Sequence, residues 1–180
     1  MQLASRRIHT GKVINLDVDQ VRFPDGSSGE LEIVRHPGAA AVVPVASDLT
    51  SADPTLLMIR QYRYATGGEL WEIPAGRLAH PGEAPEACAR RELQEEVGVT
   101  AGTIQRLTTV WTTPGFTDEA IHLYVAHDLT PTAHAREADE FIDVVPRALS
   151  EVLEMIGRGE VCDAKTVVSI LYMAGYILGR

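Results

Sequence analysis

The stretch Arg91-Glu92-Leu93-Gln94-Glu95-Glu96-Val97-Gly98-Val99 carries most of the information about fold and chemistry in this chain. Together with the residues before it, it predicts a helix over residues 83–97. At about 100° per residue, Glu92, Glu95 and Glu96 share one face of that helix. Like charges at these spacings repel by roughly a few tenths of a kcal/mol per pair, so the arrangement needs a compensating cation.

A divalent metal ion is one such cation, because Mg²⁺ and Mn²⁺ prefer oxygen ligands. Arg91 also contributes, since it can reach Glu95 one helical turn later and hold that carboxylate in one rotamer. The alternative is a solvated acidic helix face, which the glutamates alone favour. The turn Pro74-Ala75-Gly76 and the loop after it lead directly into the helix, where backbone carbonyls can approach the carboxylates. Gly98 then ends the helix.

Length and composition bound the class of protein. A chain of 180 residues with 45% apolar and 23% charged residues suits one compact globular domain with a small appendage. A net charge of −9 argues against a nucleic-acid partner, because phosphate backbones require clustered Lys and Arg. Cys88 and Cys162 form no CxxC pair, and no apolar run resembles a signal peptide or a membrane span. These features predict a soluble, cytoplasmic protein with no membrane partner.

The rest of the chain alternates between strand and helix patterns. Residues 12–23 and 30–36 read as a hairpin around the turn at residues 24–29. The remaining expected elements are strands at 39–45, 55–62, 69–76, 103–111, 119–127 and 141–145, and helices at 146–158 and 164–178. This mixture predicts an α/β or α+β layered fold. Pro37-Gly38 is the plausible boundary between an N-terminal antiparallel β segment, residues 1–36, and a main domain, residues 37–180.

The helix and its approach resemble the signature box of the Nudix hydrolases. From Glu83, seven residues lead to Arg-Glu-Leu-x-Glu-Glu-x-Gly-Val, which matches the box at every defined position. One departure is that six residues, 77–82, separate Gly76 from Glu83, where the family usually has five. The extra residue falls in a loop, where insertions cost least, and leaves the carboxylate spacing intact. The resemblance implies an α/β/α sandwich around a mixed sheet.

The resemblance also implies a metal site. By position, Glu92 and Glu96 correspond to the principal ligands of Mg²⁺, with Mn²⁺ as the alternative ion. Glu95 corresponds to a further ligand or orienting group, so that it and Arg91 are also counted among the catalytic residues. The Ala75 carbonyl corresponds to another ligand, and Glu83 to a structural residue that ties the loop to the helix.

Segments outside the box resemble the ADP-ribose pyrophosphatase branch of the family. They are residues 60–64 (Arg-Gln-Tyr-Arg-Tyr), 70–76, 113–119 and 139–142. This resemblance implies Mg²⁺-dependent hydrolysis of ADP-ribose to AMP and ribose 5-phosphate. Members of the branch are commonly homodimers whose N-terminal β segments cross over, and residues 12–36 fit that role.

Several charged or aromatic residues near these segments are candidates for binding substrate. Arginines offer charge to phosphates or stack on a base, although they also occur as ordinary surface charges. An aromatic ring can wall a base site or belong to the core, and a carboxylate can accept hydrogen bonds from an adenine amino group or a ribose. The candidates are Arg35, Arg60, Arg63, Trp71 and Glu72, with Phe116 and Glu119 for the second ribose.

The reaction also needs a general base. The stretch 135–140 offers carboxylates on a loop that can close over substrate. We expect Glu137 to be the base and Glu140 an additional metal ligand, the alternative being that both are exposed loop acids. Two rival functions stay open: hydrolysis of another nucleoside diphosphate derivative, such as a nucleotide sugar or dinucleotide, and binding of ADP-ribose without cleavage. A non-catalytic module usually has a broken glutamate cluster, whereas this cluster is intact.

Overall fold

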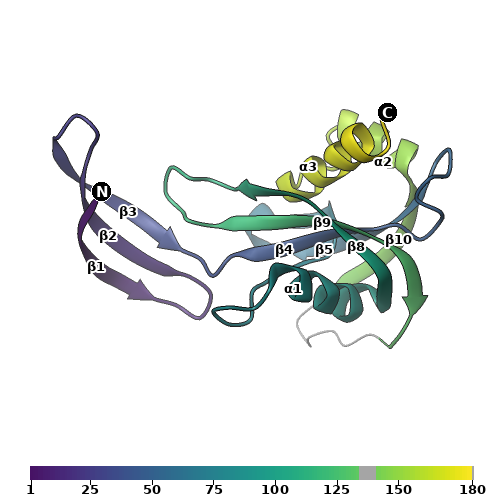
Figure 1. Ribbon diagram of the computed structural model, residues 1–180, viewed down its shortest axis with the longest axis horizontal. Coiled ribbons are helices and arrows are strands. Elements are labelled where there is room, and N and C mark those ends of the chain that lie inside the picture. Colours follow the sequence, from purple (N-terminus) through teal and green to yellow (C-terminus); the bar gives the residue numbers. More distant parts are fainter. Residues whose placement is uncertain (134–140, 180) are drawn as a thin grey trace.

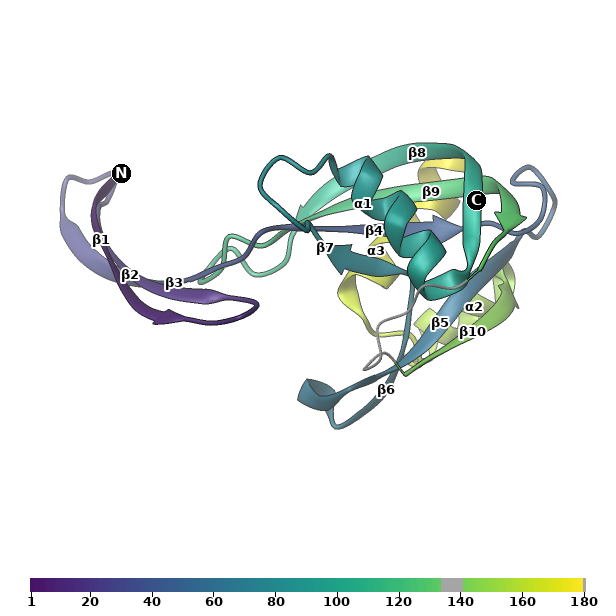
Figure 2. The ribbon, with the colours of Figure 1, turned by 90° about the horizontal axis from the view of Figure 1, so that it is seen from below.

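The structure is a computed structural model that describes residues 1–133 and 141–179. Figure 1 shows an N-terminal β arm that projects from a larger body, and Figure 2 shows the same separation after a quarter turn. The arm is an antiparallel sheet with strand order β1-β2-β3, made of β1 (Gln2–Thr10), β2 (Asn15–Arg22) and β3 (Ser28–Arg35). The predicted N-terminal β segment is therefore present, with one strand more than the expected hairpin.

The hairpin of β2 and β3 turns where the sequence places Asp25 and Gly26. The Asp25 Oδ1 atom accepts a hydrogen bond of 2.9 Å from the Ser27 backbone N–H, and Gly26 has a φ of 87° that favours glycine. Strand β1 was not among the expected elements, because each of its residues is exposed and no buried face imposes an alternating pattern.

The body contains two sheets. One has the order β7-β4-β9-β8, in which β4 and β9 are parallel and the other pairs antiparallel, so the sheet is mixed. The other is antiparallel with the order β10-β5-β6. The strands are β4 (Ala39–Pro44), β5 (Thr55–Arg63), β6 (Gly68–Glu72), β7 (Ala75–Arg77), β8 (Val99–Trp111), β9 (Ala120–Pro131) and β10 (Ile142–Ala148).

Helices cover both faces of the mixed sheet, as Figure 1 shows. They are α1 (Pro85–Glu92), α2 (Leu149–Gly157) and α3 (Ala164–Tyr172). Successive side chains of β4 point to opposite faces of the sheet, and both faces are apolar. Ala40 and Val42 pack in the cluster that contains α1. Ala41 and Val43 pack with α2 and α3 on the other face. The fold is thus the expected α/β/α sandwich, and none of the helices in the described ranges is long and apolar enough to cross a membrane.

Some boundaries differ from the expected ones for local reasons. The helix expected at 83–97 begins at Pro85, because Ala84 is extended, and its last turn, Leu93–Val97, is π-helical before Gly98 adopts a φ of 73°. The helix expected at 146–158 begins at Leu149, because residues 146–148 still pair with β5.

The strand expected at 69–76 is divided between the two sheets. Its first part, β6, pairs with β5, whereas its last residues lie in β7, which pairs with β4. Pro74 stands between them, and its carbonyl accepts a 3.0 Å hydrogen bond from the Val42 N–H. The chain therefore crosses from one sheet to the other immediately before Ala75.

Candidate active site

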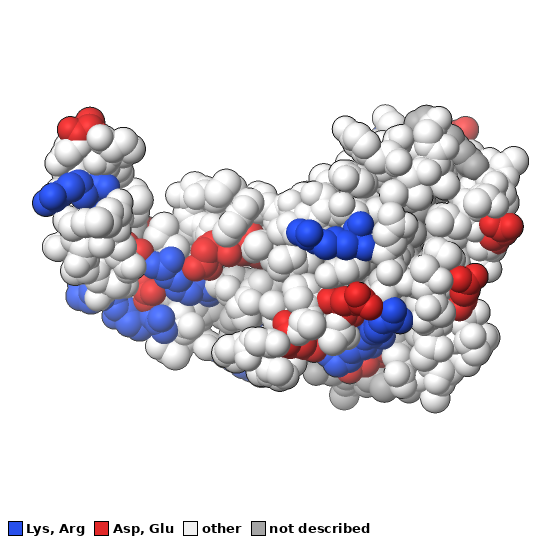
Figure 3. Space-filling model, in the orientation of Figure 1, with Lys and Arg blue, Asp and Glu red and all other residues white. Residues whose placement is uncertain are grey.

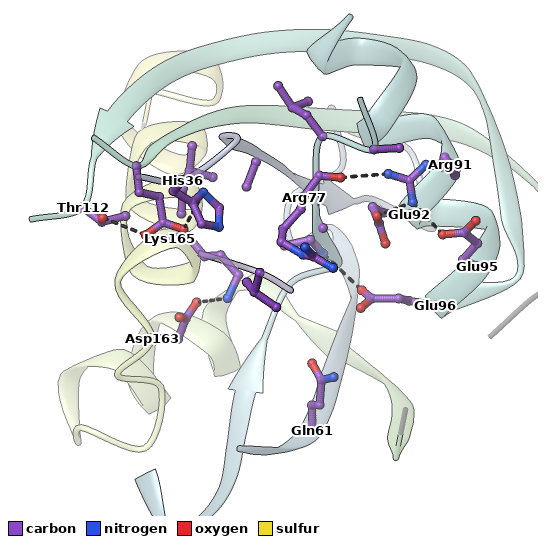
Figure 4. A pocket seen from close by; sticks show the side chains of 18 of the residues that line it. His36, Gln61, Arg77, Arg91, Glu92, Glu95, Glu96, Thr112, Asp163 and Lys165 are labelled. Carbon is purple, nitrogen blue, oxygen red and sulfur yellow. Dashed lines mark hydrogen bonds and ion pairs between the residues drawn. The ribbon is translucent and has the colours of Figure 1, made fainter. Parts of the chain in front are cut away.

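A cavity of about 670 Å³ opens where the two sheets of the body meet, beside α1. Figure 4 shows its lining, to which α1, β5, β7, the start of α3 and the residues around β3 and β9 contribute. The polar residues of the lining are His36, Gln61, Arg63, Arg77, Arg91, Glu92, Glu95, Glu96, Thr112, Glu119, Asp163 and Lys165.

The three glutamates of the box face this cavity from one side of α1 and its last turn. Glu92 and Glu96 are buried, at 5% and 2% exposure, whereas Glu95 is half-buried. The Ala75 N–H donates a 3.1 Å hydrogen bond to the Glu96 Oε2 atom, which links the helix to β7. The helical geometry expected from the sequence is therefore present, and the backbone of Ala75 lies beside the cluster.

Arg91 connects most of these carboxylates. Its Nη1 atom donates to the Glu92 Oε1 atom at 2.6 Å and to the Glu95 Oε2 atom at 2.8 Å, the second being the expected i,i+4 contact. Its Nε atom lies 3.4 Å from the Glu83 Oε1 atom. Burial alone would lower the pKa of Arg91, but the neighbouring carboxylates raise it overall, so the guanidinium stays charged. We call the set of Glu83, Arg91, Glu92, Glu95 and Glu96 the α1 cluster.

Gly76 allows Glu92 to lie directly against β7. A Cβ atom at position 76 would stand only 1.8 Å from the Glu92 Oε1 atom, so a side chain there would displace the carboxylate. Carboxylate oxygens beside a backbone carbonyl are the donors that hard divalent cations prefer, and the residues present fit such an ion. Within the two described ranges, no three acidic, His or Cys side chains surround a single metal position, and Arg91 bridges Glu92 and Glu95.

Glu83 ties the loop before α1 to the helix. Its Oε2 atom accepts a hydrogen bond from the Ala79 N–H, while its Oε1 atom contacts Arg91. The Ala79 hydrogen bond is the main reason that the pKa of Glu83 lies below its usual value. The extra residue in this loop therefore leaves the contact between loop and helix intact.

Cys88 lies behind this loop and has a structural role. Its Sγ atom donates to the carbonyls of Gly76 and Arg77, both at 3.4 Å. Burial raises the pKa of the Cys88 thiol to about 11, so it remains protonated and is not a nucleophile at neutral pH.

A second set of charges, which we call the Glu72 cluster, lies at the other end of the cavity and consists of Arg63, Glu72, Asp163 and Lys165. Glu72 is 1% exposed, and its oxygens accept hydrogen bonds of 2.7 and 2.8 Å from Arg63 and a further one from Lys165. Burial alone would raise the pKa of Glu72, but Arg63 and Lys165 lower it overall. The other three residues line the cavity, whereas Glu72 lies behind them.

Asp163 fixes the start of α3 to the crossing between the sheets. Its Oδ2 atom accepts hydrogen bonds from the N–H and the hydroxyl of Thr166, as a helix N-cap does, and from Lys165 at 3.0 Å. The Thr166 hydroxyl oxygen accepts a 3.0 Å hydrogen bond from the Ile73 N–H. Asp163 and Lys165 were not among the predicted site residues, although an Asp before an apolar helical pattern is an N-cap signal.

Two of the candidate substrate residues lie on the opposite face of the β10-β5-β6 sheet. Arg60 and Trp71 are register partners, and neither lines the cavity. The guanidinium groups of Arg60 and Arg147 lie 6.0 and 5.3 Å from the centre of the Trp71 ring, and Arg60 also pairs with Glu69 at 3.2 Å. The structure therefore surrounds Trp71 with arginines rather than exposing it to the cavity.

Arg35 and Phe116, two further candidates for binding substrate, lie where the arm meets the body. Arg35 forms ion pairs with Asp17, Asp19 and Asp118, and Figure 3 shows acidic and basic side chains side by side in this region. Phe116 is half-exposed there, and its carbonyl accepts a 2.7 Å hydrogen bond from the Val34 N–H.

The structure thus brings some candidates into one cavity and not others. Arg63 and Glu119 line the main cavity together with Arg91, Glu92, Glu95 and Glu96, whereas Arg35 lines a separate hollow of about 350 Å³ at the junction between arm and body. The expected general base, Glu137, and the expected additional ligand, Glu140, lie outside the described residues.

The chain is similar to known proteins over most of its length. The NUDIX domain model matches residues 35–165. The chain is 40% identical over 173 residues to a protein named ADP-ribose pyrophosphatase from Bacillus subtilis (strain 168), covering 95% of this chain and 90% of the relative. It is 39% identical over 173 residues to a methanol dehydrogenase activator from Bacillus methanolicus, with the same coverage. A crystal structure of an ADP compounds hydrolase shares the fold, with a TM-score of 0.83, 22% identity and coverage of 99% and 94%. The chain therefore belongs to the Nudix family.

Proposed function

We propose that this chain hydrolyses the diphosphate linkage of ADP-ribose to AMP and ribose 5-phosphate with the help of Mg²⁺. The observation that carries the proposal is the convergence of Glu92, Glu95 and Glu96 with the backbone of β7 in one cavity. The choice of ADP-ribose is supported by the name of the relative that is 40% identical over 95% of the chain.

The metal would be held by Glu92, Glu95, Glu96 and the Ala75 carbonyl, with Glu140 as an additional ligand. Mg²⁺, or Mn²⁺ as the alternative, supplies positive charge for the diphosphate and makes water a better nucleophile when it is bound at such a site. Support for this assignment comes from the oxygen donors and from the close approach that Gly76 permits.

The side chains of the cavity would bind and orient the rest of the substrate. Arg63, Arg77 and Lys165 bring positive charge to the lining, which a diphosphate requires in a chain with a net charge of −9. Glu119 would accept a hydrogen bond from a ribose hydroxyl, and Glu137 would take the proton of the attacking water. The water oxygen then joins one phosphorus, and the bond from that phosphorus to the bridging oxygen breaks.

A homodimer formed through the arm is part of this proposal. The arm extends away from the body in both ribbon views, and Leu3, Ile8, Val13 and Leu31 are among its exposed apolar residues. A second copy would cover such a surface. Light scattering should give about twice the 19.6 kDa of one chain, and a single-chain mass at working concentrations would contradict the dimer. The free thiols of Cys88 and Cys162 suit the reducing cytoplasm that we propose as its location.

The deciding experiment is chromatographic analysis of products after incubation with ADP-ribose and Mg²⁺. AMP and ribose 5-phosphate in equal amounts are the expected result, and removal of the metal by a chelator should stop their formation. Faster turnover of GDP-mannose or of a dinucleotide than of ADP-ribose would still identify a Nudix hydrolase, but one with a different substrate. Tight binding of ADP-ribose without products would instead identify a binding module.

A further inference from the structure

The face of β5 that points toward α1 changes character along the strand. Leu57 and Ile59 pack with the apolar residues beneath α1, as the side chains of alternate residues should. The next two residues on this face, Gln61 and Arg63, line the cavity instead. Figure 4 shows the Gln61 side chain extending from the strand toward the side of the cavity that contains Glu96.

Gln61 is buried, and its carbonyl oxygen has no partner among the described residues. The residue is 8% exposed, and no hydrogen bond to its Oε1 atom comes from the described part of the chain. A buried carbonyl without a donor is costly, and most such groups in folded proteins are satisfied. A leucine or methionine of similar volume would avoid this cost, so the amide has no evident role in packing.

The neighbours of Gln61 restrict what can approach its carbonyl. Arg63 is bound to Glu72, and Lys165 is bound to both Glu72 and Asp163. These two cations are therefore already engaged with carboxylates, while a fully ionised phosphate has no proton to donate. On a nucleoside diphosphate derivative, the neutral donors are the sugar hydroxyls and the amino group of the base.

We propose that Gln61 is a specificity residue whose side-chain carbonyl accepts a hydrogen bond from a neutral donor of the substrate. The donor is a sugar hydroxyl or the exocyclic amino group of the base, and the inference rests on the proposed hydrolysis of a nucleoside diphosphate derivative. A buried acceptor in the free enzyme discriminates strongly, because a ligand without the donor leaves it unsatisfied.

The test compares three variants with the wild-type enzyme. Gln61→Met keeps the size of the side chain but removes the carbonyl, Gln61→Glu keeps an acceptor oxygen, and Gln105→Met makes the same change on the exposed surface of β8. With ADP-ribose and Mg²⁺, Gln61→Met should raise KM about tenfold and leave kcat within about twofold, as the loss of one hydrogen bond to an otherwise unsatisfied acceptor predicts. Gln61→Glu should recover part of the lost affinity, and Gln105→Met should match the wild type.

Binding of the products distinguishes the two sources of the donor. Calorimetric titration with AMP and, separately, ribose 5-phosphate measures affinity without turnover. If Gln61→Met weakens ribose 5-phosphate alone, the donor is a hydroxyl of the distal sugar. If it weakens AMP alone, a comparison with inosine monophosphate, which lacks the amino group, separates the base from the adenosine ribose.

Several results would overturn the proposal. One is an unchanged KM and unchanged affinity for both products in a folded Gln61→Met protein. Another is a large fall in the unfolding temperature of both Gln61→Met and Gln61→Glu. That result would mean that the amide has a structural role. A wild-type enzyme that does not cleave ADP-ribose would refute the proposed function instead, and the titrations with AMP would still test Gln61.

Discussion

Two charged clusters border the same cavity, and they balance their charges in opposite ways. In the Glu72 cluster, two cations, Arg63 and Lys165, contact one carboxylate. In the α1 cluster, one cation, Arg91, contacts three carboxylates. The most buried acid of each cluster is buried to a similar extent, since Glu72 is 1% exposed and Glu96 is 2% exposed. The number of cations therefore distinguishes the clusters better than depth does.

The difference indicates what each cluster is for. A buried carboxylate with two cationic partners has its desolvation offset within the protein, and it links β5, β6 and α3. Three carboxylates around one arginine retain mutual repulsion, which a cation from solution would relieve. Loss of charge should therefore damage stability at the Glu72 cluster and activity at the α1 cluster.

The largest expected effect is on turnover in Glu96→Gln. We expect kcat for ADP-ribose to fall about a thousandfold or more, because several kcal/mol of charge stabilisation disappear with the carboxylate. The unfolding temperature should stay equal or rise, since repulsion within the α1 cluster decreases. Glu86→Gln on the exposed side of α1, where it pairs with Arg90, is the matched control and should retain full activity. Unchanged hydrolysis in Glu96→Gln would refute the metal cluster.

The second-largest effect is expected on the free energy of unfolding of the Glu72→Gln variant. Removing the charge leaves Arg63 without its counterion and Lys165 with Asp163 alone, which should lower the free energy of unfolding by about 2 kcal/mol, less than for fully buried pairs because the Arg63 side chain is 40% exposed. Urea denaturation measures the change. Glu69→Gln on the same strand removes an exposed pair with Arg60 and should cost less than about 0.5 kcal/mol. Equal losses in both variants would contradict the role of burial.

The pH dependence of the unfolding free energy tests the role of the Glu72 charge more closely. Because Arg63 and Lys165 hold the pKa of Glu72 below its ordinary value of 4.5, the carboxylate stabilises the fold above that value. The contribution is lost as the pH falls through the lowered pKa. The difference in unfolding free energy between the wild type and Glu72→Gln should therefore shrink between neutral pH and pH values below 4.5. A difference that grows on acidification would mean that the pKa of Glu72 is raised.

The smallest effect is expected in Glu83→Gln. A glutamine still accepts one hydrogen bond from Ala79 or contacts Arg91, so the free energy of unfolding should fall by about 1 kcal/mol. Turnover should fall only several-fold, because the loop before α1 loosens while Glu92 and Glu96 remain. Steady-state kinetics measures the turnover, and urea denaturation measures the free energy of unfolding. A loss of kcat as large as that of Glu96→Gln would place Glu83 among the metal ligands.

Local patterns predicted the parts of the molecule that local physics decides. The helical face of Glu92, Glu95 and Glu96 follows from residue spacing alone, and the stop at Gly98 follows from its left-handed conformation. The hairpin of β2 and β3 follows from the turn at Asp25-Gly26. These features depend on neighbours within a few residues.

Features that depend on distant partners were missed or misplaced. Lys165 reaches the cavity only because α3 packs beside β6, 93 residues from Glu72 along the chain. Trp71 and Glu72 point to opposite faces of a sheet, so they do not share a site as their adjacency in sequence suggested. Strand β1 has no buried face, and its existence depends on pairing with β2.

Gly76 also has a consequence for genetic variation. Because the atom that a new Cβ would meet first is the tip of the flexible Glu92 side chain, the fold can accept an alanine by turning that side chain away. An allele encoding Gly76→Ala should therefore produce normal amounts of protein that immunoblotting detects in full, while cell extracts lose the corresponding hydrolase activity. Such a null allele would escape any screen that scores only protein abundance.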